Sequence, residues 1–315
     1  MKILVTGGAG FIGSHLVKTL LDSGHEVTVL DNISSGSTRN LESRVELVNL
    51  TILLQDVVDK IALPQFDQVY HLASLASPVF YQKDPIGTAL SNSVGTYNML
   101  FNARKNGSRI LFASTSEIYG DPLQHPQDES YWGNVNPNGI RSCYDESKRF
   151  GESLMMDFHR QYGIETRIAR IFNTYGPGMK SNDGRVVPNF ILQALTDRPI
   201  TVYGDGKQTR SFCYVSDTVH GLVSLMNSDF VEPVNIGNPI EITVMELVEI
   251  IKKMSGSTAE VIFLRIPEDD PQRRCPDISR AKQVLAWEPR VSLEEGLKMT
   301  VEWFKQELKA DGSCL

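Results

Sequence analysis

The sequence has few cysteines and no long apolar run, and each scarcity excludes a class of protein. The four cysteines, Cys143, Cys213, Cys275 and Cys314, lie far apart without a CxxC pair. This spacing excludes a dense disulfide framework and a zinc knuckle. No stretch approaches the roughly 20 apolar residues that a membrane-spanning helix needs. A strand begins at Lys2, so we expect no signal peptide, while an N-terminal membrane anchor stays an open alternative. The scattered cysteines favour a reducing, cytoplasmic setting.

The sequence also has fewer basic than acidic residues. The chain of 315 residues has 31 Lys and Arg against 38 Asp and Glu, which gives a net charge of −7. This is the wrong sign for a general binder of phosphate backbones, so nucleic acid is not an expected partner. An anionic small molecule would have to be held locally, by arginine, lysine or a helix N-terminus. The 41% hydrophobic and 22% charged residues indicate a folded protein of one large or two modest domains.

Short apolar, β-branched runs alternate with helical stretches over the first 172 residues. This order predicts an α/β fold, a doubly wound parallel sheet with helices on both faces. Three expected helices end at a glycine, where a left-handed cap fits. The pattern at 50–66 does not distinguish a strand from a short helix. The expected strands are 2–6, 26–30, 45–49, 68–73, 109–115 and 166–172, and the expected helices are 14–23, 87–106 and 144–162.

After residue 172 the pattern changes to loops punctuated by glycine and proline, with shorter strands and helices. We expect a first domain at 1–172 and a smaller C-terminal substrate domain at 173–315. A segment near 212–238 is expected to return to the first domain. No Ser/Gly linker separates the halves, so they should pack closely. The helices expected here are 187–197, 216–227, 243–254, 279–285 and 293–308.

A glycine-rich turn lies between the first strand and the first helix. The segment 6–13, TGGAGFIG, has the context of a dinucleotide fingerprint. Its glycines allow a tight turn and let backbone N–H groups approach a pyrophosphate, which the helix N-terminus stabilises. Asp31 follows the second strand, where a carboxylate accepts hydrogen bonds from the adenosine ribose. Because a 2′-phosphate would be repelled there, we expect NAD rather than NADP.

A second pattern places a phenol and an amine on one helix. Tyr144 and Lys148 are four residues apart, so their side chains share a helix face. The lysine ammonium and a cationic nicotinamide are expected to favour the phenolate and to lower the pKa of Tyr144. Tyr144 would then be the base that oxidises an alcohol, and Thr115, at a strand end, would position that alcohol.

These motifs resemble the extended short-chain dehydrogenase/reductase family, in its nucleotide-sugar branch. Longer strings resemble the decarboxylases of that branch, which act on UDP-glucuronate. Together the matching strings extend over nearly the whole chain. They are 114–122 (STSEIYGDP), 131–137 (YWGNVNP), 141–146 (RSCYDE), 170–177 (RIFNTYGP), 182–187 (NDGRVV), 208–212 (QTRSF) and 270–274 (DPQRR).

The resemblance implies a reaction and a cofactor. UDP-glucuronate would become UDP-xylose and CO₂ by oxidation at C4, decarboxylation of the 4-keto intermediate and re-reduction by bound NADH. The first domain would be an NAD-binding Rossmann domain and the second would bind the UDP-sugar. A homodimer would form through a four-helix bundle of 87–106 and 144–162. Two alternatives stay open: a nucleotide-sugar 4-epimerase or 4,6-dehydratase, and a non-catalytic NAD-sensing or scaffold protein on the same fold.

The resemblance also implies site residues. Arg274 would bind the sugar carboxylate or neighbouring oxygens, and Glu117 would either steer that carboxylate by repulsion or serve as acid for C5. No metal is expected, because no His or Cys completes a ligand set at the acidic run 268–270. The expected catalytic residues are Thr115, Glu117, Tyr144, Lys148 and Arg274. The expected cofactor-binding residues, besides Tyr144 and Lys148, are Gly7, Gly10, Phe11, Ile12, Asp31, Asn32, Asp56, Val57, Leu72, Ala73 and Ser74. The expected substrate-binding residues, besides Arg274, are Asn173, Arg185, Tyr203, Gln208 and Arg210.

The chain departs from the decarboxylase pattern at three places. Ser147 stands where glycine is usual, and Cys275 stands where lysine is common. Extra residues at 50–55 precede Asp56 and Val57, the pair that resembles the adenine-contacting residues of the family.

Overall fold

The computed structural model describes residues 1–44, 48–266 and 273–310. Four features singled out in the sequence lie partly or wholly outside these ranges. They are 45–47 of the expected strand 45–49, the acidic run 268–270, 270–272 of the string DPQRR, and Cys314.

Seven parallel strands form the central sheet. Read across the sheet, they are β11 (Val234–Ile236), β6 (Thr166–Ile171), β5 (Arg109–Thr115), β4 (Gln68–His71), β1 (Lys2–Thr6), β2 (Glu26–Asp31) and β3 (Leu50–Leu54). The strand order reverses between β1 and β4, so a ligand crevice is expected at the carboxyl ends of these strands. The predicted doubly wound fold is confirmed.

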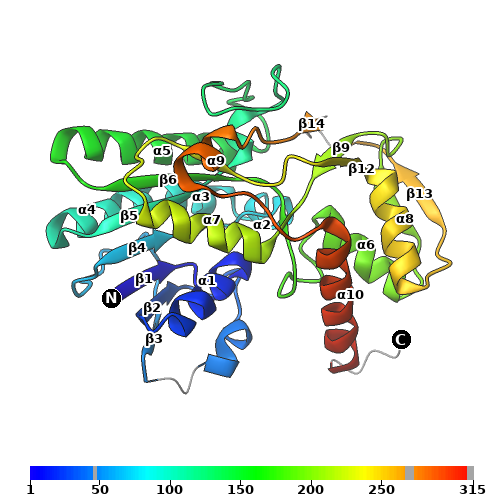
Figure 1. Ribbon diagram of the computed structural model, residues 1–315, viewed down its shortest axis with the longest axis horizontal. Coiled ribbons are helices and arrows are strands. Elements are labelled where there is room, and N and C mark those ends of the chain that lie inside the picture. The colour runs from blue at the N-terminus through cyan, green and yellow to red at the C-terminus, as the bar shows by residue number, and fades with distance from the viewer. Residues whose placement is uncertain (45–47, 267–272, 311–315) are drawn as a thin grey trace.

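Helices cover both faces of the sheet (Figure 1). One face carries α3 (Pro85–Leu90), α4 (Thr96–Asn106) and α5 (Ser142–Tyr162), and the other carries α1 (Phe11–Asp22) and α7 (Val215–Asn227). A π-helical turn at Ser91–Gly95 joins α3 to α4, so the single helix expected at 87–106 contains a local change of winding. Gly107 and Gly163 end α4 and α5 in the left-handed conformation, as predicted.

The third strand lies later in the chain than expected. It is Leu50–Leu54, paired with β2 from Val27↔Leu50 to Asp31↔Leu54. Residues 48–49 form a turn instead, and the Val48 side chain is exposed. Apolar composition favoured 45–49 in the sequence, but pairing with β2 selects the later run. The undecided residues 50–54 are therefore a strand.

A smaller group of elements stands beside the sheet, on the right of Figure 1. In it, α6 (Val186–Leu195), α8 (Val244–Ser255) and α10 (Leu293–Ala310) pack together. A parallel pair, β8 (Ile200–Tyr203) and β13 (Val261–Leu264), lies with them, and β9 (Thr209–Ser211) lies between β12 (Glu241–Thr243) and β14 (Arg273–Arg274). The remaining elements are α2 (Pro78–Tyr81), α9 (Ser279–Leu285), β7 (Thr174–Tyr175), β10 (Cys213–Tyr214) and the 3₁₀ turns η1 (Thr38–Arg44) and η3 (Ser116–Tyr119).

The two halves of the chain share one apolar core. A continuous cluster of buried side chains includes Val5 of β1, Leu16 of α1, Phe190 of α6 and Leu247 of α8. In addition, β11, which lies within the segment 212–238, pairs with β6 of the central sheet. The boundary between the domains at residue 172 stays a prediction.

Candidate active site

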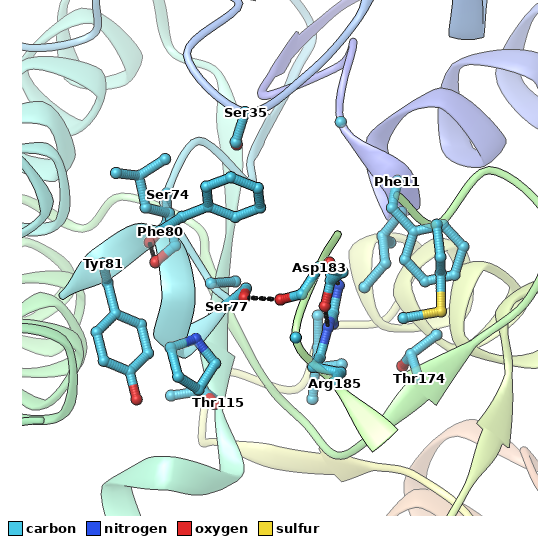
Figure 2. A pocket seen from close by; sticks show the side chains of 18 of the residues that line it. Phe11, Ser35, Ser74, Ser77, Phe80, Tyr81, Thr115, Thr174, Asp183 and Arg185 are labelled. Atoms are coloured by element: carbon cyan, nitrogen blue, oxygen red, sulfur yellow. Dashed lines mark hydrogen bonds and ion pairs between the residues drawn. The ribbon is translucent and has the colours of Figure 1, made fainter. Parts of the chain in front are cut away.

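A cavity of about 560 Å³ lies at the carboxyl ends of the strands. Every residue that we expected to be catalytic, to bind the cofactor or to bind the substrate lines this cavity. Figure 2 shows two of its walls, one with Ser74 and Thr115 and the other with Phe11 and Thr174. The fold therefore gathers residues from both halves of the chain around one space.

The glycine-rich turn at the start of α1 leaves no room for side chains. A Cβ on Gly7, whose φ is +71°, would lie 2.8 Å from the backbone nitrogen of Ala73, and one on Gly13 would lie 2.1 Å from the Gly7 carbonyl oxygen. Gly10 is the N-cap of α1 and provides no side-chain cap. A close turn that presents a helix N-terminus to the cavity fits the pyrophosphate of a dinucleotide.

Asp31 is buried and its carboxylate is fixed by two backbone amides. Ala9 N–H donates to Oδ2 at 3.0 Å and Ile33 N–H donates to Oδ1 at 2.8 Å. The next residue, Asn32, donates from Nδ2 to Oδ2 of Asp56 at 2.7 Å. The extra residues before Asp56 therefore do not move it away from the cavity, where it lies beside the end of β2.

Tyr144 and Lys148 lie buried in the first turns of α5. Lys148 Nζ donates to the carbonyl oxygen of Ala113 at 2.7 Å and lies 5.8 Å from the Tyr144 ring centroid. Burial lowers the pKa of Lys148 to about 7, although Glu152 acts in the opposite direction. Burial also raises the pKa of Tyr144, and the hydrogen bond with Thr115 only partly offsets this. The lowering expected from the sequence includes the charge of a bound nicotinamide, and in the chain alone burial dominates the pKa of Tyr144.

Glu117 lies between two guanidinium groups. Its Oε2 pairs with Arg141 and with Nη2 of Arg274, the latter at 3.4 Å. Burial acts to raise the pKa of Glu117, but Arg274 and Arg141 hold it at about 2. Arg274 is itself buried and also donates to the carbonyl oxygens of Ser116 and Gly120. Glu117 is therefore an anion at neutral pH, which favours electrostatic steering over the role of proton donor.

The expected substrate residues other than Asn173, which follows β6, come from the smaller group of elements. Arg185 is the N-cap of α6, and Arg210 on β9 is the register partner of Arg274 on β14. Gln208 donates from Nε2 to the carbonyl oxygen of Tyr203 at 2.6 Å, and the half-exposed Tyr203 lines the same cavity. Together with Asn173, they give this side of the cavity a cationic, hydrogen-bonding lining suited to an anionic ligand.

The sequence interpretation missed several lining residues. Arg141 lies three residues before Tyr144, and its position beside the YxxxK motif was the available signal. Tyr81 stacks on the Tyr144 ring, with centroids 5.1 Å apart and planes 6° apart. The Ser77 hydroxyl donates to the carbonyl oxygen of Asp183, whose carboxylate pairs with Arg185 (Figure 2). No local pattern connects Ser77 with Asp183, because the fold alone brings their loops together.

The model of the NAD dependent epimerase/dehydratase family matches residues 3–237. The chain belongs to this family. Its fold, with the glycine-rich turn, Asp31 and the Tyr144–Lys148 pair around one cavity, is that of a family member with NAD as cofactor.

Two curated relatives within the family are similar over almost the whole chain. UDP-glucuronic acid decarboxylase 1 of Xenopus tropicalis is 54% identical over 308 residues, which cover 98% of this chain and 73% of the relative. UDP-glucuronic acid decarboxylase 6 of Arabidopsis thaliana is 55% identical over 309 residues, which cover 98% of this chain and 90% of the relative.

Solved structures of family members superimpose closely. A UDP-glucose 4-epimerase from Thermotoga maritima with UDP-glucose has a TM-score of 0.91 at 34% identity and covers 98% of this chain and 100% of its own. A UDP-glucuronic acid 4-epimerase from Bacillus cereus, in complex with UDP-glucuronic acid and NAD, has a TM-score of 0.87 at 29% identity with the same coverages. Within the described parts of our chain, no helix is long and apolar enough to cross a membrane.

Proposed function

We propose that the protein converts UDP-glucuronate to UDP-xylose and CO₂, with NAD as a recycled cofactor. The observation that carries this proposal is the position of Glu117 between Arg141 and Arg274 on the wall that also holds Thr115 and Tyr144. A paired carboxylate and guanidinium cluster at the reacting sugar suits a substrate that itself has a carboxylate. Relatives with 54 and 55% identity that are named UDP-glucuronic acid decarboxylases support the same reaction.

Ligand binding uses the charged lining. Arg185 and Arg210 would hold the diphosphate of the UDP-sugar, and the N-terminus of α1 would hold the pyrophosphate of NAD. Asp31 would accept hydrogen bonds from the adenosine ribose. These contacts would place the sugar between Thr115 and the Tyr144–Lys148 pair.

Oxidation at C4 begins with the removal of the proton from the 4-hydroxyl group of the sugar. Tyr144 as phenolate takes the proton of the 4-hydroxyl, and Thr115 orients that hydroxyl. When bound, NAD⁺ supplies the two-electron oxidant and a positive charge beside the phenol. Lys148, on the same helix face as Tyr144, is the nearby amine that favours the phenolate in its protonated form.

Decarboxylation follows from the position of the new ketone. The C6 carboxylate is β to the C4 carbonyl, so the C5–C6 bond breaks with its electron pair delocalised onto the 4-oxygen. Tyr144 and Thr115 donate to that oxygen and stabilise its developing charge. Arg274 and Arg141 select the carboxylate, and the anionic Glu117 repels it toward release as CO₂. C5 would then take a proton from solvent, and the 4-ketone would take back the proton held by Tyr144 and the hydride that NAD would store when bound, which gives UDP-xylose.

One experiment separates this function from those of its relatives. The purified protein is incubated with NAD⁺ and, separately, with UDP-glucuronate, UDP-glucose and dTDP-glucose, and CO₂ and products are followed by mass spectrometry. We expect CO₂ and UDP-xylose from UDP-glucuronate only. Epimerised UDP-glucose or dehydrated dTDP-glucose without CO₂ would assign a 4-epimerase or a 4,6-dehydratase, and no turnover of any sugar would favour the NAD-sensing or scaffold alternative.

We further infer a homodimer through α4 and α5. Tyr97 and Phe101 on α4 and Phe150 on α5 are about half exposed. Large aromatic side chains on two adjacent helices form an apolar face of the kind that a second copy of the chain covers in a four-helix bundle. A reducing, cytoplasmic setting remains our prediction from the scarcity of cysteine.

A further inference from the structure

A buried glutamine connects Arg274 with the loop that follows η3. Gln127 lies in the loop between η3 and α5, and its side chain has no exposed surface. It does not line the cavity, so it has no direct part in the reaction proposed above. All of its hydrogen-bonding groups nevertheless have partners, which implies a specific role in the fold.

Two of these hydrogen bonds bracket Cys275, the residue after Arg274. Gln127 N–H donates to the Cys275 carbonyl oxygen at 2.9 Å, and Cys275 N–H donates to Gln127 Oε1 at 3.0 Å. The Cys275 thiol donates to the carbonyl oxygen of Pro239 at 3.3 Å. The backbone of Cys275 is thus held from both directions by one glutamine, and its side chain is held by another segment.

Further contacts fix Gln127 itself. Its carbonyl oxygen accepts from Asp277 N–H at 2.8 Å and from Asn235 Nδ2 at 2.9 Å, and its Nε2 donates to the Gln124 carbonyl oxygen at 2.8 Å. Asn235 belongs to β11 of the central sheet and is also fully buried. Gln127 therefore anchors the segment after Arg274 to the rigid sheet.

The other side of Arg274 completes a closed ring of contacts. Its backbone pairs with Arg210 of β9, and its guanidinium binds the η3 turn through Ser116, Gly120 and Glu117. The loop that starts after Gly120 returns through Gln127 to Cys275. Glu117 and Arg274 contact each other within this ring. The distance between their side chains therefore depends on the hydrogen bonds between Gln127 and Cys275.

We propose that Gln127 is a positioning residue that fixes Arg274, and through it Glu117, for the release of CO₂. This inference rests on the proposed function. Loss of the Oε1 acceptor leaves a buried amide unpaired next to Arg274, and the segment can relieve this only by shifting. A shift of about 1 Å in a catalytic group can cost about 100-fold in rate. Oxidation at C4 depends instead on β5 and α5, which Gln127 does not contact in the hydrogen bonds described above.

The test compares Gln127→Met with Gln124→Met. Gln127→Met keeps the length of the side chain and removes its acceptor. Gln124 is the control because it lies in the same loop, but its side chain donates to Asp128 and not to Cys275. We expect Gln127→Met to slow CO₂ release about tenfold or more with KM within about threefold of the unaltered protein. With UDP-glucuronate deuterated at C4, the kinetic isotope effect on turnover by Gln127→Met should fall toward unity, because decarboxylation becomes the rate-limiting step. The control should retain both values.

A double-mutant cycle with Arg274→Ala isolates the positioning role. If Gln127 acts through Arg274, Gln127→Met should cause no further loss in the Arg274→Ala background. Gln127→Asn, whose shorter amide cannot reach Cys275 in the same way, replaces Gln127→Met if that variant does not fold. Additive losses, or an unchanged isotope effect, would overturn the inference. Absence of CO₂ release by the unaltered protein would instead overturn the proposed function.

Discussion

Lys148 Nζ donates a hydrogen bond to the carbonyl oxygen of Ala113 at 2.7 Å, so α5 is connected to the last residues of β5 beneath the candidate active site. The Lys148 side chain is buried, and burial lowers its pKa to about 7 from the ordinary value of 10.5. The same burial that fixes the ammonium near Tyr144 therefore makes its charge sensitive to pH near neutrality.

This relationship predicts how stability depends on pH in the chain without ligands. Between about pH 8 and pH 10, the unfolded chain holds a proton on Lys148 that the folded chain has lost, so Lys148 contributes a free energy of unfolding that rises with pH. The buried thiols Cys213 and Cys275, whose pKa burial raises to about 12, contribute the opposite slope in the upper part of this window. Asp145, whose pKa burial raises to about 8, contributes the opposite slope mainly below this window. Lys148→Met should remove the Lys148 contribution and so make the slope of the free energy of unfolding against pH less positive than in the unaltered protein, as measured by urea denaturation at several pH values. Equal slopes for both proteins would contradict the lowered pKa.

Asp31 predicts cofactor preference. NAD⁺ should bind more tightly than NADP⁺, because the 2′-phosphate would meet a buried carboxylate. Asp31→Ala should weaken NAD⁺ binding by about tenfold or more, or roughly 1.4 kcal/mol. Asp31→Asn, which keeps an acceptor for one of the amides of Ala9 and Ile33, should lose less NAD⁺ affinity and discriminate less against NADP⁺. Titration calorimetry provides these affinities, and tighter binding of NADP⁺ to the unaltered protein would refute the assignment.

The exposed aromatic face predicts the oligomeric state. Phe101→Glu with Phe150→Glu should convert a dimer to a monomer at micromolar concentration, because two charges would be buried against an apolar partner. Phe263→Glu is a matched control, since Phe263 on β13 is about equally exposed but lies in the smaller group of elements. Sedimentation velocity distinguishes the species. A monomeric unaltered protein would remove the basis for the dimer.

Residues close together in sequence were predictable because their chemistry is local. The glycine-rich turn of α1 and the pair Tyr144 and Lys148 need only a strand end or a helix face to define their positions, and the structure has those elements. The third strand was misplaced because strand pairing, not apolar composition, selects Leu50–Leu54. Local pattern thus predicted most of the sheet and one side of the cavity.

Contacts between distant segments were not predictable in the same way. Ser77 meets Asp183, and Gln127 meets Cys275, only after the loops from both halves have folded together. The raised pKa of Tyr144 in the chain alone was not predictable, because the sequence shows the neighbouring lysine but not the burial that opposes ionisation. The desolvation of a side chain is a property of the whole fold.

Glu117 provides the sharpest test of the chemistry. Its carboxylate, with a pKa of about 2, is held between Arg274 and Arg141. Glu117→Gln keeps the shape and removes the charge, so both guanidiniums become available to the substrate carboxylate and the repulsion that favours release of CO₂ is lost. UDP-glucuronate should then bind as tightly as before or more tightly, while the rate of CO₂ release falls at least about tenfold, or roughly 1.4 kcal/mol of barrier.

A lower kcat together with a lower KM indicates a residue that raises the energy of the bound substrate, whereas a lower kcat with an unchanged KM indicates an interaction made only in the transition state. Arg274→Ala is the contrasting variant, because loss of a cation should lower kcat and also raise KM for UDP-glucuronate. Both variants should bind NAD⁺ normally, since Asp31 and the α1 turn are unchanged. Steady-state kinetics with detection of CO₂, together with calorimetry for NAD⁺, provide the three quantities. If Glu117→Gln raises KM in parallel with Arg274→Ala, Glu117 serves to hold Arg274 and does not repel the carboxylate.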